Sequence, residues 1–106
     1  ILILGVTFKE NCPDIRNSKV ADVHHELKEF GLEVDAYDYQ ADPKEVKEEY
    51  GIHIIDEITE KYDGILLAVS HSKFLELNIE SLKKESDSVV YDLKGFLPRN
   101  QVDSRL

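Results

Sequence analysis

What this sequence lacks excludes several classes of protein. It has a single cysteine, Cys12, so no disulfide can form within the chain, and we expect a reducing compartment, the cytoplasm. No apolar run approaches the length of about 18 residues that a membrane-spanning helix needs, so we expect no membrane partner. No segment resembles a secretory signal peptide.

Basic residues are also scarce. The 13 lysines and arginines are outnumbered by 22 acidic residues, which gives a net charge of −9 at pH 7. A general nucleic-acid-binding surface must be basic, because it displaces counterions from phosphates. We therefore expect no nucleic-acid partner, although a few well-placed cations are enough to bind one phosphate ligand.

Methionine is absent altogether, and the first residue belongs to a continuous apolar run over residues 1–6. A natural translation product begins with methionine and rarely starts inside a strand. We expect these 106 residues to be one domain of a longer protein whose missing part lies upstream.

Apolar runs alternate with segments of helical periodicity along the chain. Strands are predicted at residues 1–6, 32–38, 52–55, 65–69 and 89–91. Helices are predicted at residues 18–30 and 42–50, over a stretch to residue 77 that is capped by Ser70 or Ser72, and at 79–84, with a brief helical turn at 56–62. Ser18 is predicted to cap the first helix, and Asp42 with Pro43 to begin the second. The alternation predicts an α/β fold, a three-layer Rossmann-like open parallel sheet of about five strands in the order 3-2-1-4-5.

Two lysines are placed where such a sheet binds ligands, beyond the carboxyl ends of its strands. Lys9 follows the first predicted strand and Lys94 follows the fifth. With one strand between them, these strands lie about 10 Å apart, so both ammonium groups could reach one diphosphate. The helix N-terminus near Ser18 adds positive potential. Ordinary surface lysines are the alternative, and position alone does not decide between the two.

Other polar residues at this edge have two interpretations each. Arg16 could bind phosphate through two parallel hydrogen bonds, or pair with Asp14 and hold the loop, which we favour. His71, at the end of the fourth predicted strand, could cap the next helix or touch a ligand. Asp38 is not expected to bind a dinucleotide, because the preceding turn lacks the Gly-x-Gly-x-x-Gly pattern. A capping or loop-fixing role is expected for it.

No residue of the chain is a convincing nucleophile or metal ligand. Cys12 precedes a proline and has no base nearby in the sequence, so we expect it to be inert. No pair of histidines has metal-ligand spacing. We expect no catalytic residue, no cofactor-binding residue and no metal in this chain.

The string over residues 5–18, Gly-Val-Thr-Phe-Lys-Glu-Asn-Cys-Pro-Asp-Ile-Arg-Asn-Ser, closely resembles the start of the C-terminal, UDP-binding domain of UDP-glucose/GDP-mannose dehydrogenases. Residues 34–38, 68–74 and 90–95 resemble the family's second, fourth and fifth strands in order. The first string is most similar to bacterial enzymes that oxidise UDP-N-acetylglucosamine or UDP-N-acetylgalactosamine at C6, in the synthesis of capsules and O-antigens.

This resemblance implies a function for the full-length enzyme. It would oxidise the C6 alcohol of a UDP-sugar to a carboxylate, with NAD bound by a missing N-terminal domain. The catalytic cysteine and the dimer contacts would lie in a missing central region, so the enzyme would be a homodimer or higher oligomer and this fragment alone inactive. By position, Phe8 and Lys9 match substrate-binding residues, and Lys94 matches a basic residue that is often arginine.

Two other interpretations remain at this point. The chain could be a stand-alone nucleotide-binding module without catalysis. It could also be a receiver-like signalling module, which shares the alternating pattern. A receiver needs an acidic pair after the first strand, where this chain has Phe8 and Lys9.

Overall fold

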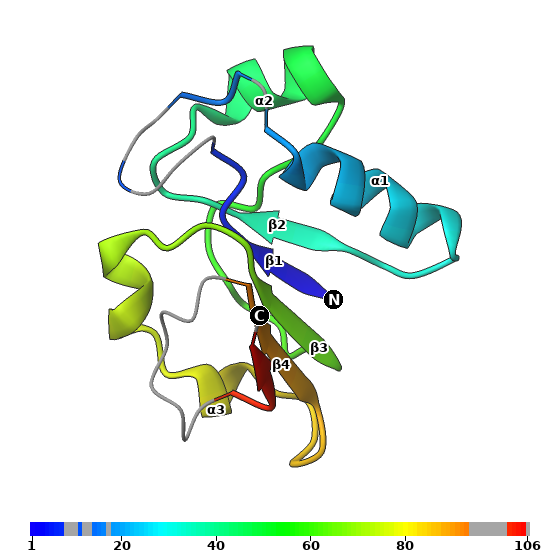
Figure 1. Ribbon diagram of the computed structural model, residues 1–106, viewed down its shortest axis with the longest axis vertical. Helices are drawn as coiled ribbons and strands as arrows, with labels where there is room; N and C mark the ends of the chain where they lie inside the picture. Colours follow the sequence, from blue (N-terminus) through cyan, green and yellow to red (C-terminus); the bar gives the residue numbers. More distant parts are fainter. Residues whose placement is uncertain (8–10, 12–13, 17, 94–101, 106) are drawn as a thin grey trace.

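The computed structural model describes residues 1–7, 11, 14–16, 18–93 and 102–105. Strands and helices alternate along them (Figure 1). In chain order they are β1 (Leu2–Leu4), α1 (Val20–Glu29), β2 (Asp35–Tyr37), α2 (Pro43–Tyr50), β3 (Gly64–Leu67), the 3-10 helix η1 (Ser72–Glu76), α3 (Ile79–Leu82), β4 (Val89–Asp92) and β5 (Ser104–Arg105).

The strands form one parallel sheet in the order β2-β1-β3-β4-β5. The predicted α/β class and the order of the first, second, fourth and fifth predicted strands are therefore confirmed. The predicted strand at 52–55 is reduced to a single parallel bridge between Ile54 and Ala36, on the outer side of β2. The two-residue strand β5, which was not predicted, pairs with β4 at the opposite border.

The sheet separates two apolar clusters, as expected for three layers. Leu2 and Leu4 of β1 pack in the cluster that contains Phe74 and Ile79. The other cluster contains buried residues of α1 and α2, such as Val46. Figure 1 shows α1 and α2 together beside β2, whereas η1 and α3 lie beside β3 and β4. β1 is fully buried between these layers, which explains its continuous apolar run.

The helix α2 begins and ends where the sequence predicts. The side chain of Asp42 accepts a hydrogen bond from the Lys44 amide at 2.9 Å, and Pro43 is the first helical residue. Gly51 ends the helix in the left-handed conformation, with φ of 70°. The cap and the C-terminal glycine of this helix were both readable from a few neighbouring residues.

Two local predictions were wrong. Ser18 does not cap α1, which begins at Val20, because its hydroxyl instead donates to the carbonyl oxygen of Val6 at 2.7 Å. Residues 56–62 form no helical turn. Tyr62 makes a parallel bridge with Lys83, which joins the segment before β3 to the end of α3.

Candidate functional site at the carboxyl edge of the sheet

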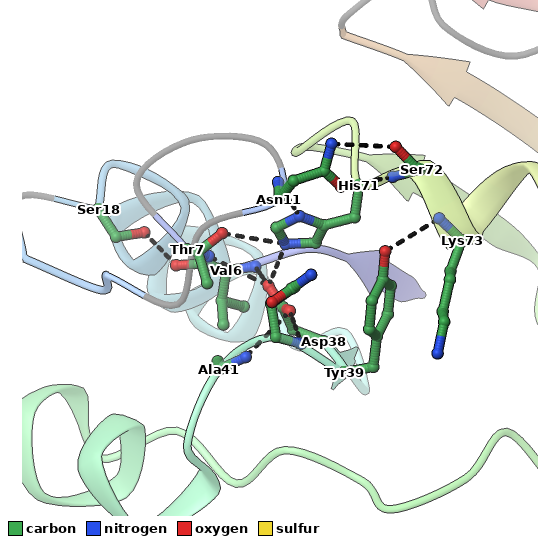
Figure 2. A network of polar contacts seen from close by, with 11 residues as sticks. Val6, Thr7, Asn11, Ser18, Asp38, Tyr39, Ala41, His71, Ser72 and Lys73 are labelled. Atoms are coloured by element: carbon green, nitrogen blue, oxygen red, sulfur yellow. Dashed lines mark hydrogen bonds and ion pairs between the residues drawn. The ribbon is translucent and has the colours of Figure 1, made fainter.

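The carboxyl ends of β1, β2 and β3 lie side by side. Leu4 of β1 is in register with Tyr37 of β2 and with Leu67 of β3. The residues that follow these strands therefore meet at one edge, where Figure 2 shows Thr7, Asp38 and His71 directed toward one another. This edge is where open α/β sheets bind their ligands.

Asp38 fixes the two loops that leave β1 and β2. Its side chain is fully buried. Four backbone amides donate to it: those of Val6 at 2.7 Å, Thr7 at 3.2 Å, Gln40 at 2.8 Å and Ala41 at 3.2 Å. This is the loop-fixing role expected from the missing dinucleotide turn.

His71 links Asp38 to the loop after β1. Its ring is fully buried, and Nε2 lies 3.0 Å from Asp38 Oδ2 and 3.0 Å from Thr7 Oγ1. Nδ1 accepts a hydrogen bond from the backbone amide of Asn11 at 2.8 Å. Because an amide can donate only to a nitrogen that has a lone pair, the ring is neutral, with its proton on Nε2 facing Asp38.

The carboxylate form of Asp38 is favoured despite its burial. Burial alone raises the pKa of this carboxyl group, since desolvation penalises the charge. The hydrogen bonds from His71 and from the amides of Val6 and Gln40 outweigh burial, so the net pKa of Asp38 is below its usual value. Asp38 therefore brings to this edge a negative charge whose two oxygen atoms both already accept hydrogen bonds.

Asn11 joins the loop after β1 to the loop after β3. Its side chain donates to Ser72 Oγ at 3.0 Å and accepts from the Ser72 amide at 2.9 Å. Its φ is 54°, a left-handed conformation that asparagine tolerates better than most residues. Backbone and side chain of Asn11 are thus both bound to residues 71–72 (Figure 2).

Gly5 allows the loop after β1 to pass close to the end of β3. A Cβ atom at this position would lie 2.6 Å from Val69 Cβ, and φ is 98°. Both facts require glycine here. It is the only glycine in the segment between β1 and α1, so the backbone cradle that a dinucleotide pyrophosphate needs is not encoded in this loop.

The three substrate-binding residues predicted from the resemblance, Phe8, Lys9 and Lys94, lie outside the described residues, as does Cys12. Their neighbours in the chain are placed at the predicted edge. Thr7 follows β1, and Leu93 follows β4, with β3 between the two strands. This is the separation by one strand on which the diphosphate interpretation of the two lysines depends.

Arg16 and Asp14 form a local pair. The guanidinium donates from Nε to Oδ1 at 3.0 Å and from Nη2 to Oδ2 at 2.9 Å. The Arg16 amide also donates to Oδ1 at 2.9 Å. Of the two roles considered for Arg16, the structure shows the loop-holding contact.

His71 has no side-chain capping bond to η1, although it occupies the N-cap position.

Sequence reasoning missed a cation at this edge. The backbone amide of Lys73 donates to the Tyr39 hydroxyl at 2.9 Å, and Lys73 Nζ lies 5.4 Å from the centre of the Tyr39 ring. Figure 2 shows the lysine side chain extended beside that ring. The available signal was its position two residues after His71, on the loop that follows β3.

Among the described residues, no group of three histidine, cysteine or carboxylate side chains is close enough to hold a metal ion. Over the same part of the chain, no helix has the length and apolar character needed to cross a membrane.

The sequence pattern of the UDP binding domain of the UDP-glucose/GDP-mannose dehydrogenase family matches residues 2–99. The chain belongs to this family. Two relatives are named UDP-N-acetyl-D-glucosamine 6-dehydrogenase, from Salmonella typhi (45% identical) and Pseudomonas aeruginosa (42% identical). Both alignments cover 100% of this chain and 26% of the relative, so the chain spans about a quarter of their length.

A solved protein structure has the same fold. The UDP-N-acetyl-mannosamine dehydrogenase Cap5O from S. aureus superposes with a TM-score of 0.73 over 98% of this chain and 24% of its own. The sequences are 22% identical, so this likeness supports the fold alone. The buried network around His71 thus lies in a chain that matches the family's UDP binding domain in sequence and the solved protein in fold.

Proposed function

We propose that this chain is the UDP-sugar-binding domain of an NAD-dependent nucleotide-sugar 6-dehydrogenase. The substrate class is a UDP-N-acetylhexosamine, whose C6 alcohol is oxidised to a carboxylate for bacterial surface polysaccharides. The observation that supports this best is the family match over nearly the whole chain, joined to a carboxyl edge whose loops are held by buried polar contacts.

The role of this chain in that reaction is to bind and orient the UDP group. Lys9 and Lys94 would contact the diphosphate, and Phe8 would pack against the nucleotide. Charge-assisted contacts suit this task, since each contributes about 1.5–3 kcal/mol. Holding the distant nucleotide fixes the hexose relative to the reacting groups, and this positioning lowers the barrier without any chemistry in this chain.

The remaining parts of the reaction would lie elsewhere in a longer protein. The loop after β1 has one glycine and no dinucleotide pattern, so NAD would bind to another domain. The nucleophile would also come from that part. The full-length enzyme would form a homodimer or a larger assembly.

Separate titrations of UDP and NAD⁺ test this function. We expect this 106-residue chain to bind UDP, to show no saturable NAD⁺ binding, and to reduce no NAD⁺ when mixed with a UDP-sugar. Isothermal titration calorimetry measures the binding, and absorbance of NADH measures turnover. Binding of NAD⁺ without UDP would overturn the assignment of the two ligands.

A further inference from the structure

Asn11 is bound to the loop after β3 by two kinds of hydrogen bond. Its side chain exchanges two hydrogen bonds with Ser72. Its backbone amide donates to Nδ1 of the fully buried His71 ring at 2.8 Å. The contacts with Ser72 involve no titratable group, whereas the amide contact needs the lone pair of an imidazole nitrogen. Of these contacts, the one with His71 is therefore the one that can depend on pH.

The His71 ring has a single place for an additional proton. Its Nε2 carries the proton of the neutral ring and faces Asp38 Oδ2 and Thr7 Oγ1, each at 3.0 Å. A second proton must enter at Nδ1, which has the remaining lone pair of the ring. The Asn11 amide and a protonated Nδ1 would then be two donors that face each other at 2.8 Å. Protonation of the ring and the hydrogen bond from Asn11 therefore exclude each other.

The surroundings of the ring direct a proton to His71 rather than to Asp38. Burial raises the pKa of the Asp38 carboxyl group, but hydrogen bonds from His71 and from backbone amides outweigh burial, so the net pKa is below its usual value. Asp38 thus stays a carboxylate over the range in which histidine side chains take up a proton. Its negative charge, 3.0 Å from Nε2, stabilises an imidazolium ring.

Asp38 is the one charged side chain that is hydrogen-bonded to the ring among the described residues (Figure 2). The ammonium group of Lys73 lies beside the Tyr39 ring, 5.4 Å from its centre, and not at His71. The other neighbours of the ring carry no charged side chain: Thr7 and Asn11 of the loop after β1, Tyr39 of the loop after β2, and Phe74 of η1.

We propose that His71 is a pH-sensitive latch between the loops after β1 and β3. With the neutral ring, the Asn11 amide is bound and the two loops are joined. As pH falls, the proton that enters at Nδ1 breaks this hydrogen bond, while Nε2 stays paired with Asp38. Of the Asn11 contacts in this network, those with Ser72 then remain. The latch goes beyond the UDP-binding role and does not depend on it, because every contact that it uses lies within the chain.

NMR spectroscopy of the protein as its gene encodes it follows both parts of the latch. Nitrogen chemical shifts of the His71 ring report which nitrogen atoms carry a proton, and hydrogen exchange reports the protection of the Asn11 amide. Between about pH 8 and about pH 5, where histidine side chains take up a proton, we expect Nδ1 to become protonated. The protection factor of the Asn11 amide should fall about tenfold in parallel, the effect of losing one hydrogen bond. This factor compares exchange with that of an unstructured amide at the same pH, so the intrinsic effect of pH on exchange is removed.

The Ala68 amide is the internal reference. It donates to the carbonyl oxygen of Leu4 at 3.0 Å, between the ends of β3 and β1. Its protection factor should not follow the protonation of His71. Equal losses at Ala68 and Asn11 would show that acid opens the whole edge of the sheet, which would contradict a latch. A ring that stays neutral down to about pH 5, or an Asn11 amide that stays protected beside a protonated ring, would also overturn the proposal.

His71→Asn removes the titration and keeps an acceptor. The new side-chain oxygen can lie near the place of Nδ1 and accept from the Asn11 amide, so protection at Asn11 should no longer depend on pH. His53→Asn is the matched control, because it makes the same substitution at an exposed histidine. It should keep the wild-type behaviour at Asn11. Dependence on pH that persists in His71→Asn, or that disappears in His53→Asn, would assign the effect to another group and overturn the latch. The wild-type titration uses no variant, so it decides the question even if His71→Asn does not fold.

Discussion

The two edges of the sheet are built differently. At the carboxyl edge, polar side chains from the ends of β1, β2 and β3 are buried and bind one another, with Asp38 and His71 at the centre. At the amino edge, apolar side chains are exposed, with Phe30 82% exposed and Val89 53% exposed. Buried polar groups are costly unless every partner is present. The contrast indicates that the loops at the carboxyl edge are held more tightly by buried polar contacts than those at the amino edge.

The strongest test of this contrast is removal of the central carboxylate. Asp38→Ala leaves four backbone amides and the His71 ring without their acceptor, so we expect a loss of about 3–5 kcal/mol in the free energy of unfolding. Urea denaturation measures it. Asp42→Ala, which removes an exposed helix cap, should cost only about 1 kcal/mol. Similar losses in the two variants would contradict the special status of the carboxyl edge.

Asp38 should also govern stability in acid. Its pKa is lowered by folding, so its contribution is present above the unfolded pKa of about 3.9 and is lost as pH falls through the lower folded value. The stability difference between wild type and Asp38→Ala should therefore shrink below about pH 4. A difference that stays constant from pH 7 to pH 3 would show that the carboxylate form is not the stabilising one.

A pair of glycine variants compares the same two edges. Gly5→Ala at the carboxyl edge introduces a Cβ that meets Val69 at 2.6 Å, in a backbone with φ of 98°. We expect a loss of about 2–4 kcal/mol in unfolding free energy. Gly31→Ala at the amino edge has φ of 84° but no atom within 4 Å, so only backbone strain of about 1–2 kcal/mol remains. Thermal unfolding of both variants measures whether Gly5→Ala loses more stability than Gly31→Ala, as expected.

Ligand binding should separate the edges more directly. Lys9→Ala in the protein as encoded should weaken UDP binding by about ten- to a hundredfold, the value of one charge-assisted phosphate contact. Lys94→Ala should act in the same direction, and NAD⁺ affinity should be unchanged in both. Lys61→Ala is the matched control at the amino edge, beside Tyr62. Unchanged UDP affinity in both Lys9→Ala and Lys94→Ala, with the fold intact by circular dichroism, would reduce these lysines to surface residues.

The fold was largely predictable because its signals are local. The apolar run at the start of the chain and the cap, proline and glycine around α2 each depend on a few neighbouring residues. The strand β5 could not be predicted, since Ser104–Arg105 has no apolar pattern and owes its place to pairing with β4. The apolar pattern predicted a strand at 52–55, but it could not show that the pairing would be limited to one bridge between Ile54 and Ala36.

The site was predictable only in part. The place of Asp38 after a strand, without a dinucleotide turn, was enough to predict a capping or loop-fixing role, and the structure shows that it fixes loops. The contact between Asn11 and His71 joins residues 60 positions apart, and no local pattern reports such a pair. Ser18 shows the same limit, because a distant carbonyl competes with the helix end for its hydroxyl. Side chains that bond across the sheet become visible only in three dimensions.

The smallest expected effect lies at the amino edge and appears at high pH. Burial and the hydrogen bond to Asp35 raise the pKa of Tyr62 well above its usual value. The stability that Tyr62 contributes is therefore complete below the unfolded pKa of about 10 and is lost only as pH rises toward the higher folded value. At neutral pH, Tyr62→Phe should cost about 1 kcal/mol, the typical value of one hydrogen bond.

The difference in unfolding free energy between wild type and Tyr62→Phe should then decrease above about pH 10, whereas the Asp38→Ala difference should not change there. Urea denaturation of the three proteins between pH 7 and pH 11 measures both trends. If the Asp38→Ala difference also fell in alkali, the two edges would be energetically coupled. We expect the two edges to be independent, because the two hydrogen-bond sites lie at opposite ends of the strands. Asp38 bonds to the backbone just after β1, whereas Tyr62 bonds to Asp35 at the start of β2.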